Sequence, residues 1–101
     1  ASCDRSGALL IVDEIWTGIG RAGAMLASAG VVADVLCLGK ALGGGAAISA
    51  CVGRDAVMAA WGGHGGSAIH TATHFGAPPA CVSCLPLASQ MVMRDCSWAD
   101  T

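Results

Sequence analysis

The sequence predicts an α/β fold whose sheet begins with two apolar runs. Residues 8–15 are dominated by Leu, Ile and Val, and the length of this run is typical of a strand buried on both faces. Residues 31–38 form a second such run, which Ala33 and Asp34 interrupt, so the strand proper is predicted at residues 35–38. A strand, a connection and a second buried strand in this order favour the α/β class.

Glycines and prolines delimit the other predicted elements. In order, these are an irregular loop at residues 17–23, a short helix at 24–29, a third strand at 48–52, a short helix at 55–61, a loop at 62–77 and a helix at 80–93. The glycines 43–45 are expected to form the turn before the third strand. Pro78 suits a first helical turn, and Pro86 is expected to kink the last helix.

The composition indicates that most of this chain is interior. Hydrophobic residues make up 54% of the 101 residues, a further 15 residues are glycine, and charged residues make up only 12%. An average globular domain has about 25% charged residues, and a small domain has proportionally more surface. We therefore predict a single partial domain, residues 1–101, that belongs to something larger. The same composition excludes a disordered tail and a coiled coil.

Charge and hydropathy argue against two kinds of partner. A net charge of -2 gives no basic surface for nucleic acid. Residues 56–93 contain no Asp, Glu, Lys or Arg, but glycine pairs, histidines and prolines interrupt them, which argues against a membrane-spanning helix. No secretory signal is recognised at the amino end, and the six cysteines lie mostly in apolar runs. We expect reduced thiols and a cytoplasmic location.

Lys40 is the only lysine of the chain, and it lies at the end of the second apolar strand. Apolar surroundings would disfavour its charged form, and a neutral amine attacks carbonyls to form Schiff bases. Asp13 ends the first apolar run. The spacing between the two residues is long enough for a parallel crossover, which would place both side chains at the carboxyl edge of the sheet, where ligands bind.

An amine and a carboxylate at that edge suit pyridoxal phosphate. This cofactor needs a lysine for its aldehyde and an acid opposite its pyridine nitrogen, which keeps the nitrogen protonated. The glycines 43–45 allow the backbone to approach a flat ligand, and the hydroxyl groups of residues 67–73 are candidate phosphate donors. The spacing alone leaves an ordinary surface lysine and a strand-end aspartate equally open.

Three sequence blocks resemble the class III (ω-amino-acid type) aminotransferases of fold type I, which depend on pyridoxal phosphate. The blocks, at residues 9–23, 33–53 and 70–81, are LLIVDEIWTGIGRAG, ADVLCLGKALGGGAAISACVG and HTATHFGAPPAC. The resemblance implies an incomplete part of the large cofactor-binding domain, with a mostly parallel sheet and flanking helices. It also implies transamination between an amino acid or ω-amine and a 2-oxo acid by a larger enzyme.

The resemblance implies a role for three residues. Lys40 matches the lysine that forms the Schiff base with the cofactor and then moves protons as general base and acid. Asp13 matches the acid that pairs with the pyridine nitrogen. Thr73 matches the threonine that binds the cofactor phosphate across a dimer interface, so a homodimer is expected of the full enzyme. Trp16 departs from the family, which often has Gln there to hold the ring hydroxyl of the cofactor.

Other functions stay open at this point. A mutase or racemase would use the same cofactor, and an inactive truncated remnant or a non-catalytic folding or pairing fragment would account for the short chain. Cys81, Cys84, His70 and His74 form a zinc-like set by residue type. The apolar helical setting of the two cysteines disfavours a metal site, and we expect none.

Two neighbours of these positions have a structural interpretation. Glu14 adjoins Asp13, and since neighbours in a strand point to opposite faces, Glu14 is not expected to share the role of Asp13. Cys37 lies in the apolar run Val35–Leu38 and is expected to be a small buried hydrophobic residue.

Overall fold

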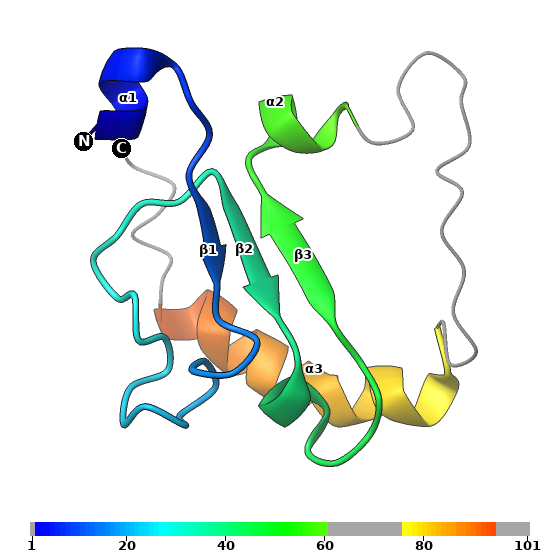
Figure 1. Ribbon diagram of the computed structural model, residues 1–101. Helices are drawn as coiled ribbons and strands as arrows, with labels where there is room; N and C mark the ends of the chain where they lie inside the picture. Colours follow the sequence, from blue (N-terminus) through cyan, green and yellow to red (C-terminus); the bar gives the residue numbers. More distant parts are fainter. Residues whose placement is uncertain (1, 61–75, 95–101) are drawn as a thin grey trace.

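The computed structural model describes residues 2–60 and 76–94. Its elements are, in chain order, α1 (Ser2–Ser6), β1 (Ile11–Asp13), β2 (Val35–Leu38), the 3-10 helix η1 (Lys40–Gly43), β3 (Ala50–Gly53), α2 (Asp55–Met58) and α3 (Pro78–Arg94). Figure 1 shows the three strands side by side, with α3 crossing near their lower ends.

The strands form one sheet in the order β1–β2–β3. β1 and β2 are parallel, with Ile11 opposite Val35 and Asp13 opposite Cys37. β3 runs antiparallel to β2, because residues 39–49 fold into η1 and a tight turn and do not make the long crossover that a parallel neighbour requires. The α/β class is confirmed, with one parallel and one antiparallel pairing among the described strands.

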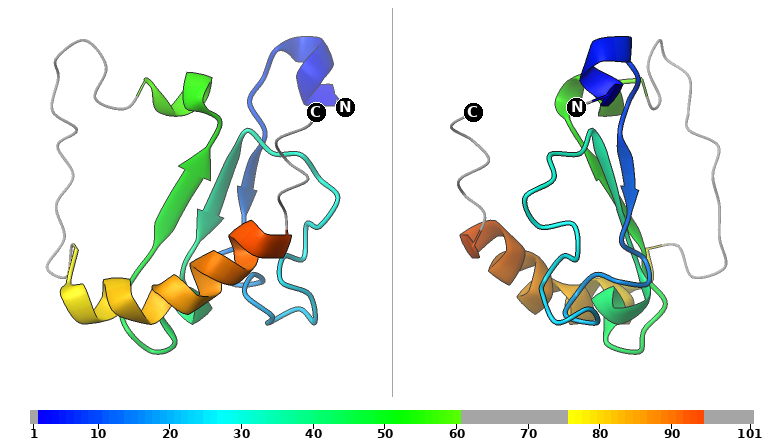
Figure 2. Two further views of the ribbon diagram at one scale, coloured as in Figure 1. Left: turned by 180° about the vertical axis from the view of Figure 1, so that it is seen from behind. Right: turned by 60° about the vertical axis from the view of Figure 1, so that its left-hand side comes forward.

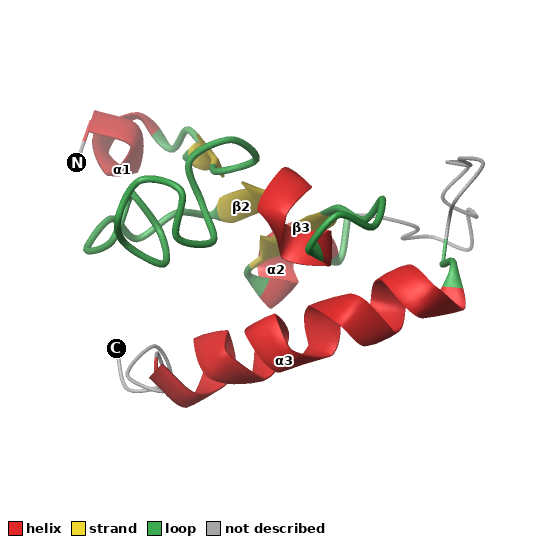
Figure 3. Cartoon of the chain, turned by 90° about the horizontal axis from the view of Figure 1, so that it is seen from below, coloured by secondary structure: helices red, strands yellow, loops and turns green. Residues whose placement is uncertain are grey.

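A small core lies at the carboxyl end of β2. The buried apolar side chains of the described residues are Leu38 at the end of β2, Leu42 in η1 and Ala80 near the start of α3. α3 packs against η1, and seen from below it lies along one side of the sheet (Figure 3). The connection between β1 and β2 lies on the same side (Figure 2). Burial of Leu42 fixes η1, and with it the backbone of Lys40, at the sheet edge.

Several large apolar side chains are exposed in this chain. They include Ile11 on β1, Val52 on β3, and Val82 and Leu85 on α3. The residues that the composition assigns to an interior therefore lie partly at the surface. The partial domain stays a prediction, and this exposure agrees with it, because a larger domain would cover these side chains.

The predicted helix at residues 24–29 is wrong. This segment forms turns. Two of its carbonyls accept hydrogen bonds from residues earlier in the chain and not from later residues as in a helix. The Ile19 N–H donates to Met25 O (2.7 Å), and the Gly20 N–H donates to Ala24 O (3.2 Å). The Ser28 N–H donates to the Glu14 carboxylate (2.6 Å). Backbone groups committed to these partners are not available for a helical turn.

Some predicted boundaries also change. β2 spans the predicted residues 35–38, and α3 begins at Pro78, includes Pro86 and continues to Arg94. β1 is shorter than residues 8–15, because the Leu10 N–H bonds to the Asp34 carboxylate (2.7 Å) and not to a strand. β3 starts and ends later than predicted, α2 ends at Met58, and the sequence does not predict α1 or η1. No described helix is long and apolar enough to cross a bilayer.

Candidate cofactor site

Asp13 and Lys40 lie at the same edge of the sheet. Asp13 is the last residue of β1, and Lys40 begins η1 two residues after β2 ends at Leu38. β1 and β2 are parallel neighbours, with Asp13 in register with Cys37. Because the carboxyl ends of parallel strands meet at one edge, the structure brings the carboxylate and the amine to the edge that the sequence predicts.

The Asp13 carboxylate is exposed and locally oriented. The Ile15 N–H donates a hydrogen bond to its Oδ1 at 2.9 Å. A side-chain oxygen that accepts from the backbone two residues later makes an Asx turn. This turn ends β1 and holds the carboxylate at the sheet edge.

Lys40 is exposed, which corrects the expectation that apolar surroundings shelter it. The physical reason is that the backbone leaves the sheet after Leu38 and enters η1 with a left-handed φ of 43° at Lys40. A residue with a Cβ in this region carries about 1–2 kcal/mol of strain. The Leu42 N–H donates to Gly39 O (3.0 Å), which holds the strained residue inside a closed turn. Residues held in such strained backbone conformations cluster at functional sites.

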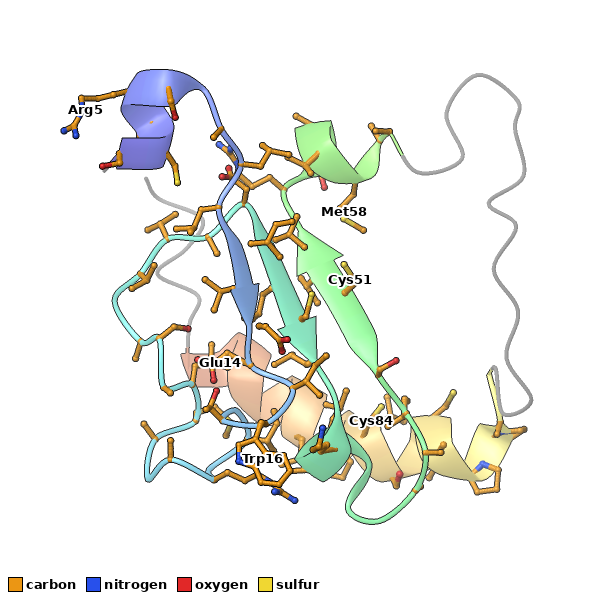
Figure 4. All side chains as sticks on the ribbon, viewed as in Figure 1. Arg5, Glu14, Trp16, Cys51, Met58 and Cys84 are labelled. Carbon is orange, nitrogen blue, oxygen red and sulfur yellow. The ribbon has the colours of Figure 1, made fainter. Side chains whose placement is uncertain are left out.

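The Trp16 indole makes cation–π contacts with two basic side chains. The Lys40 Nζ lies 5.2 Å from the ring centroid, and the Arg21 Cζ lies 5.0 Å from it. Figure 4 shows Trp16 at the lower end of the sheet, beside η1. Trp16 is 65% exposed, so each cation–π contact contributes about 0.5–1 kcal/mol. Trp16, which stands where the family often has Gln, is therefore the residue that contacts Lys40.

The turn after Lys40 depends on two glycines. Gly44 caps η1 in the left-handed conformation with a φ of 58°, and its N–H donates to Ala41 O (3.1 Å). Gly43 is buried, and a Cβ there would lie 2.8 Å from Ile48 Cγ2. The absence of a side chain at Gly43 lets the segment before β3 pack closely against η1, which stabilises the backbone on which Lys40 stands.

Among the described residues, Glu14 has a charged side chain that is buried, with 2% of its surface exposed. It accepts hydrogen bonds from the Thr17 hydroxyl and from the Ser28 N–H (2.6 Å). Burial raises the pKa of Glu14, but these hydrogen bonds outweigh the burial and bring the pKa below its ordinary value. Glu14 therefore anchors the connection between β1 and β2, against which Figure 4 shows it lying.

The contrast between Glu14 and Asp13 agrees with the prediction that they have different roles, since one is buried and the other exposed. The anchoring itself was not predicted. A signal was present in the sequence, because Glu14 is the only glutamate of the chain and a threonine follows it three residues later.

The model of the family described as Aminotransferase class-III matches residues 1–97. The chain belongs to the class III aminotransferase family.

Two curated relatives of this class III aminotransferase chain are themselves aminotransferases. A putrescine aminotransferase from Pectobacterium atrosepticum is 43% identical over 98 residues, which covers 94% of this chain and 20% of the relative. An acetylornithine aminotransferase from Clostridium acetobutylicum is 37% identical over 94 residues, which covers 89% of this chain and 23% of the relative. The chain thus spans only about a fifth of the length of these relatives.

Two solved structures resemble the chain in three dimensions. One is the ornithine delta-aminotransferase of Plasmodium falciparum, from a study of its redox regulation, with a TM-score of 0.72, 35% identity, and coverage of 92% of this chain and 23% of that one. The other is the ornithine aminotransferase of Toxoplasma gondii, crystallised with oxidised glutathione and with partial occupancy of pyridoxal phosphate at its active site. It has a TM-score of 0.69, 40% identity, and coverage of 97% and 22%. These likenesses confirm the predicted fold class, an incomplete part of an aminotransferase domain.

The opposite edge of the class III aminotransferase sheet has a structural ion pair. Asp34 pairs with Arg54 and also accepts the Leu10 N–H at 2.7 Å. A pocket of about 380 Å³ lies at this edge, lined in part by these three residues and Val31. Because the Asp34 carboxylate is already engaged by a side chain and a backbone N–H, its role is to join the amino ends of β1 and β2 to the end of β3.

Three predicted site residues lie outside the described residues of this class III aminotransferase chain. They are Thr73 of the phosphate site and His70 and His74 of the alternative zinc set. Cys81 and Cys84 of that set lie in α3, where the Cys84 thiol donates to Cys81 O at 3.1 Å. Within residues 2–60 and 76–94, no three His, Cys, Asp or Glu side chains gather as metal ligands would.

Proposed function

We propose that this chain supplies the lysine and the acid that hold pyridoxal phosphate in a larger class III aminotransferase. The full enzyme would move an amino group between an amino acid or ω-amine and a 2-oxo acid. The observation that carries the proposal is the position of Asp13 and Lys40 at the carboxyl ends of two neighbouring parallel strands. Ligands of open α/β sheets bind at this edge.

The described residues fit this cofactor. Lys40 presents an exposed primary amine for the aldehyde, and Asp13 presents an exposed carboxylate, oriented by the Ile15 N–H, for the pyridine nitrogen. The pairing of β1 with β2 sets the spacing of the two backbones. The assignment of Thr73 to the phosphate rests on the resemblance of residues 70–81 alone.

Each residue has a distinct task in the proposed mechanism. When bound, pyridoxal phosphate supplies an aldehyde for amines and a ring that accepts an electron pair. The Lys40 Nζ would hold the cofactor through its aldehyde, and as a free amine it would remove and return the proton at the substrate carbon. The Asp13 carboxylate holds a proton on the ring nitrogen by its negative charge. Trp16 orients the lysine by the contact between its indole and Nζ.

We also propose that the full enzyme is a cytoplasmic homodimer with an ω-amine donor. The names of the relatives support the donor, because putrescine, acetylornithine and ornithine point to transamination of diamine-type substrates. The same names favour transamination over a mutase or racemase. The free thiols of the described cysteines agree with a reducing compartment. The homodimer rests on the match of Thr73 to the family threonine.

Borohydride reduction tests the proposal on the purified full-length enzyme that contains residues 1–101. Pyridoxal phosphate is added, the mixture is reduced and digested with trypsin, and the peptides are mapped by mass spectrometry. A cofactor adduct on Lys40 blocks cleavage there, so the expected product is a single modified peptide of residues 22–54. Lys40→Arg should carry no side-chain adduct, and Asp13→Asn should lower the yield at limiting cofactor.

A matched control separates specific binding from the reaction of any exposed amine. Arg5→Lys places a lysine on α1, at the far end of β1 from Asp13. Specific binding predicts that Lys40 is labelled in clear preference to the introduced lysine. It also predicts that a diamine added before borohydride displaces the cofactor from Lys40 and so lowers the yield of the labelled peptide. Equal labelling of both lysines, or labelling that is insensitive to Asp13→Asn, would overturn the proposal and favour a non-catalytic remnant.

A further inference from the structure

Three side chains form a row across one face of the sheet. Asp13 on β1 is in register with Cys37 on β2, and Cys37 is in register with Cys51 on β3. Directly paired residues of neighbouring strands project to the same face. Burial raises the pKa of the Cys37 thiol, and the neighbouring Cys51 and then Asp13 raise it further. The two thiols are therefore close enough to interact, beside the candidate acid.

We propose that Cys37 and Cys51 are a redox-active dithiol, which a low-molecular-weight disulfide such as oxidised glutathione converts to an intramolecular disulfide. Directly opposed residues of an antiparallel pair have Cα atoms about 4.5–5.5 Å apart. Disulfides require about 4.4–6.8 Å. Both cysteines are free thiols in the structure, and the strand register already holds them at bridging distance, so closure requires no change of fold.

The exposure of the two thiols sets the order of the reaction. Cys51 is exposed and Cys37 is half-buried, so the Cys51 thiolate attacks the glutathione disulfide first. The S–S bond of glutathione breaks, one glutathione thiol leaves, and Cys51 carries a mixed disulfide. Cys37 Sγ then attacks Cys51 Sγ and displaces the second glutathione thiol. In total the protein loses two electrons and two protons, and these convert one glutathione disulfide to two thiols.

The neighbouring pair Cys81 and Cys84 is arranged differently. The Cys84 thiol donates to Cys81 O at 3.1 Å, so Sγ of Cys84 is directed at the helix backbone. No described feature places Cys3 beside another thiol. Selectivity for the pair on β2 and β3 is therefore expected. A bridge there would also change the surroundings of Asp13. Its effect on cofactor binding rests on the proposed function, whereas the bridge itself does not.

Peptide mapping tests this inference, because trypsin cleaves at Lys40 between the two cysteines. Residues 22–40 contain only Cys37, and residues 41–54 contain only Cys51. The purified chain is treated with oxidised glutathione, the remaining thiols are blocked with N-ethylmaleimide, and the digest is analysed without reduction. The expected product is the pair of these two peptides joined by a disulfide, which reduced glutathione reverses.

Variants separate the two steps and control for folding. Cys37→Ser should stop at a glutathione mixed disulfide on Cys51, Cys51→Ser should leave Cys37 almost unmodified, and Cys84→Ser should form the bridge as the native chain does. Far-UV circular dichroism checks that each variant is folded. A native chain that stops at the mixed disulfide, a bridge between other cysteines, or equal modification of Cys37 with and without Cys51 would overturn the inference. None of these readouts depends on pyridoxal phosphate.

Discussion

Replacement of Glu14 tests how the end of β1 is built, with the adjacent Asp13 as an internal control. Glu14 is buried and accepts hydrogen bonds from the Thr17 hydroxyl and the Ser28 N–H. A hydrogen bond to a charged group contributes about 1.5–3 kcal/mol. Glu14→Ala loses both and should therefore reduce the free energy of unfolding by about 3–6 kcal/mol, against a typical total of about 5–15 kcal/mol.

Two milder variants sharpen this prediction. Glu14→Gln keeps one acceptor oxygen for the Ser28 N–H. It loses the charge and replaces the oxygen that accepts from the Thr17 hydroxyl with an NH2 donor, so a loss of about 1–2 kcal/mol is expected. Asp13→Asn keeps the acceptor for the Ile15 N–H at an exposed position, so a change within about 0.5 kcal/mol is expected. Urea unfolding followed by far-UV circular dichroism near neutral pH measures all three free energies.

Acidification provides the second arm of the test. The pKa of Glu14 is lower in the folded chain than its ordinary value of 4.5. The native state therefore gains stability above that value and loses it as the pH falls through the lowered pKa. The gap between the native chain and Glu14→Gln should shrink over the same range. A gap that does not change with pH, or a Glu14→Ala variant as stable as the native chain, would refute the anchoring role.

Three further outcomes follow from the site. Lys40→Gly should have a free energy of unfolding about 1 kcal/mol higher than that of Lys40→Ala, because φ is 43° at this position. In urea unfolding, equal midpoints for the two variants would show that the backbone is not strained. Gly43→Ala should lose about 1–3 kcal/mol in the same assay, since the new Cβ meets Ile48 Cγ2, and a second change of Ile48→Ala should recover part of it; a fully stable single variant would contradict the close approach. The thermal midpoint of the native chain should fall as the pH rises above 9.0, the ordinary pKa of a cysteine thiol, because the fold raises the pKa of Cys37 and favours its neutral thiol. The same decline in a Cys37→Ser variant would exclude ionisation of Cys37 as the cause.

The candidate site was predictable because its residues are marked by local pattern. Asp13 ends an apolar run, and Lys40 follows another and is the only lysine of the chain. Local pattern did not predict the exposure of Lys40, because exposure depends on the direction in which η1 leaves the sheet. It also misjudged residues 24–29, where helix-favouring residues are held in turns by the distant Glu14 carboxylate.

The sequence by itself determined what depends on near neighbours along the chain. Val35–Leu38 is a strand because four consecutive apolar residues follow a polar break, and α3 begins at Pro78 because proline suits a first helical turn. Only the tertiary structure decided that β3 runs antiparallel to β2 and that Cys37 lies between Asp13 and Cys51. Such pairings are contacts between residues far apart in the chain, and their free energy comes from packing and hydrogen bonds that no local pattern contains.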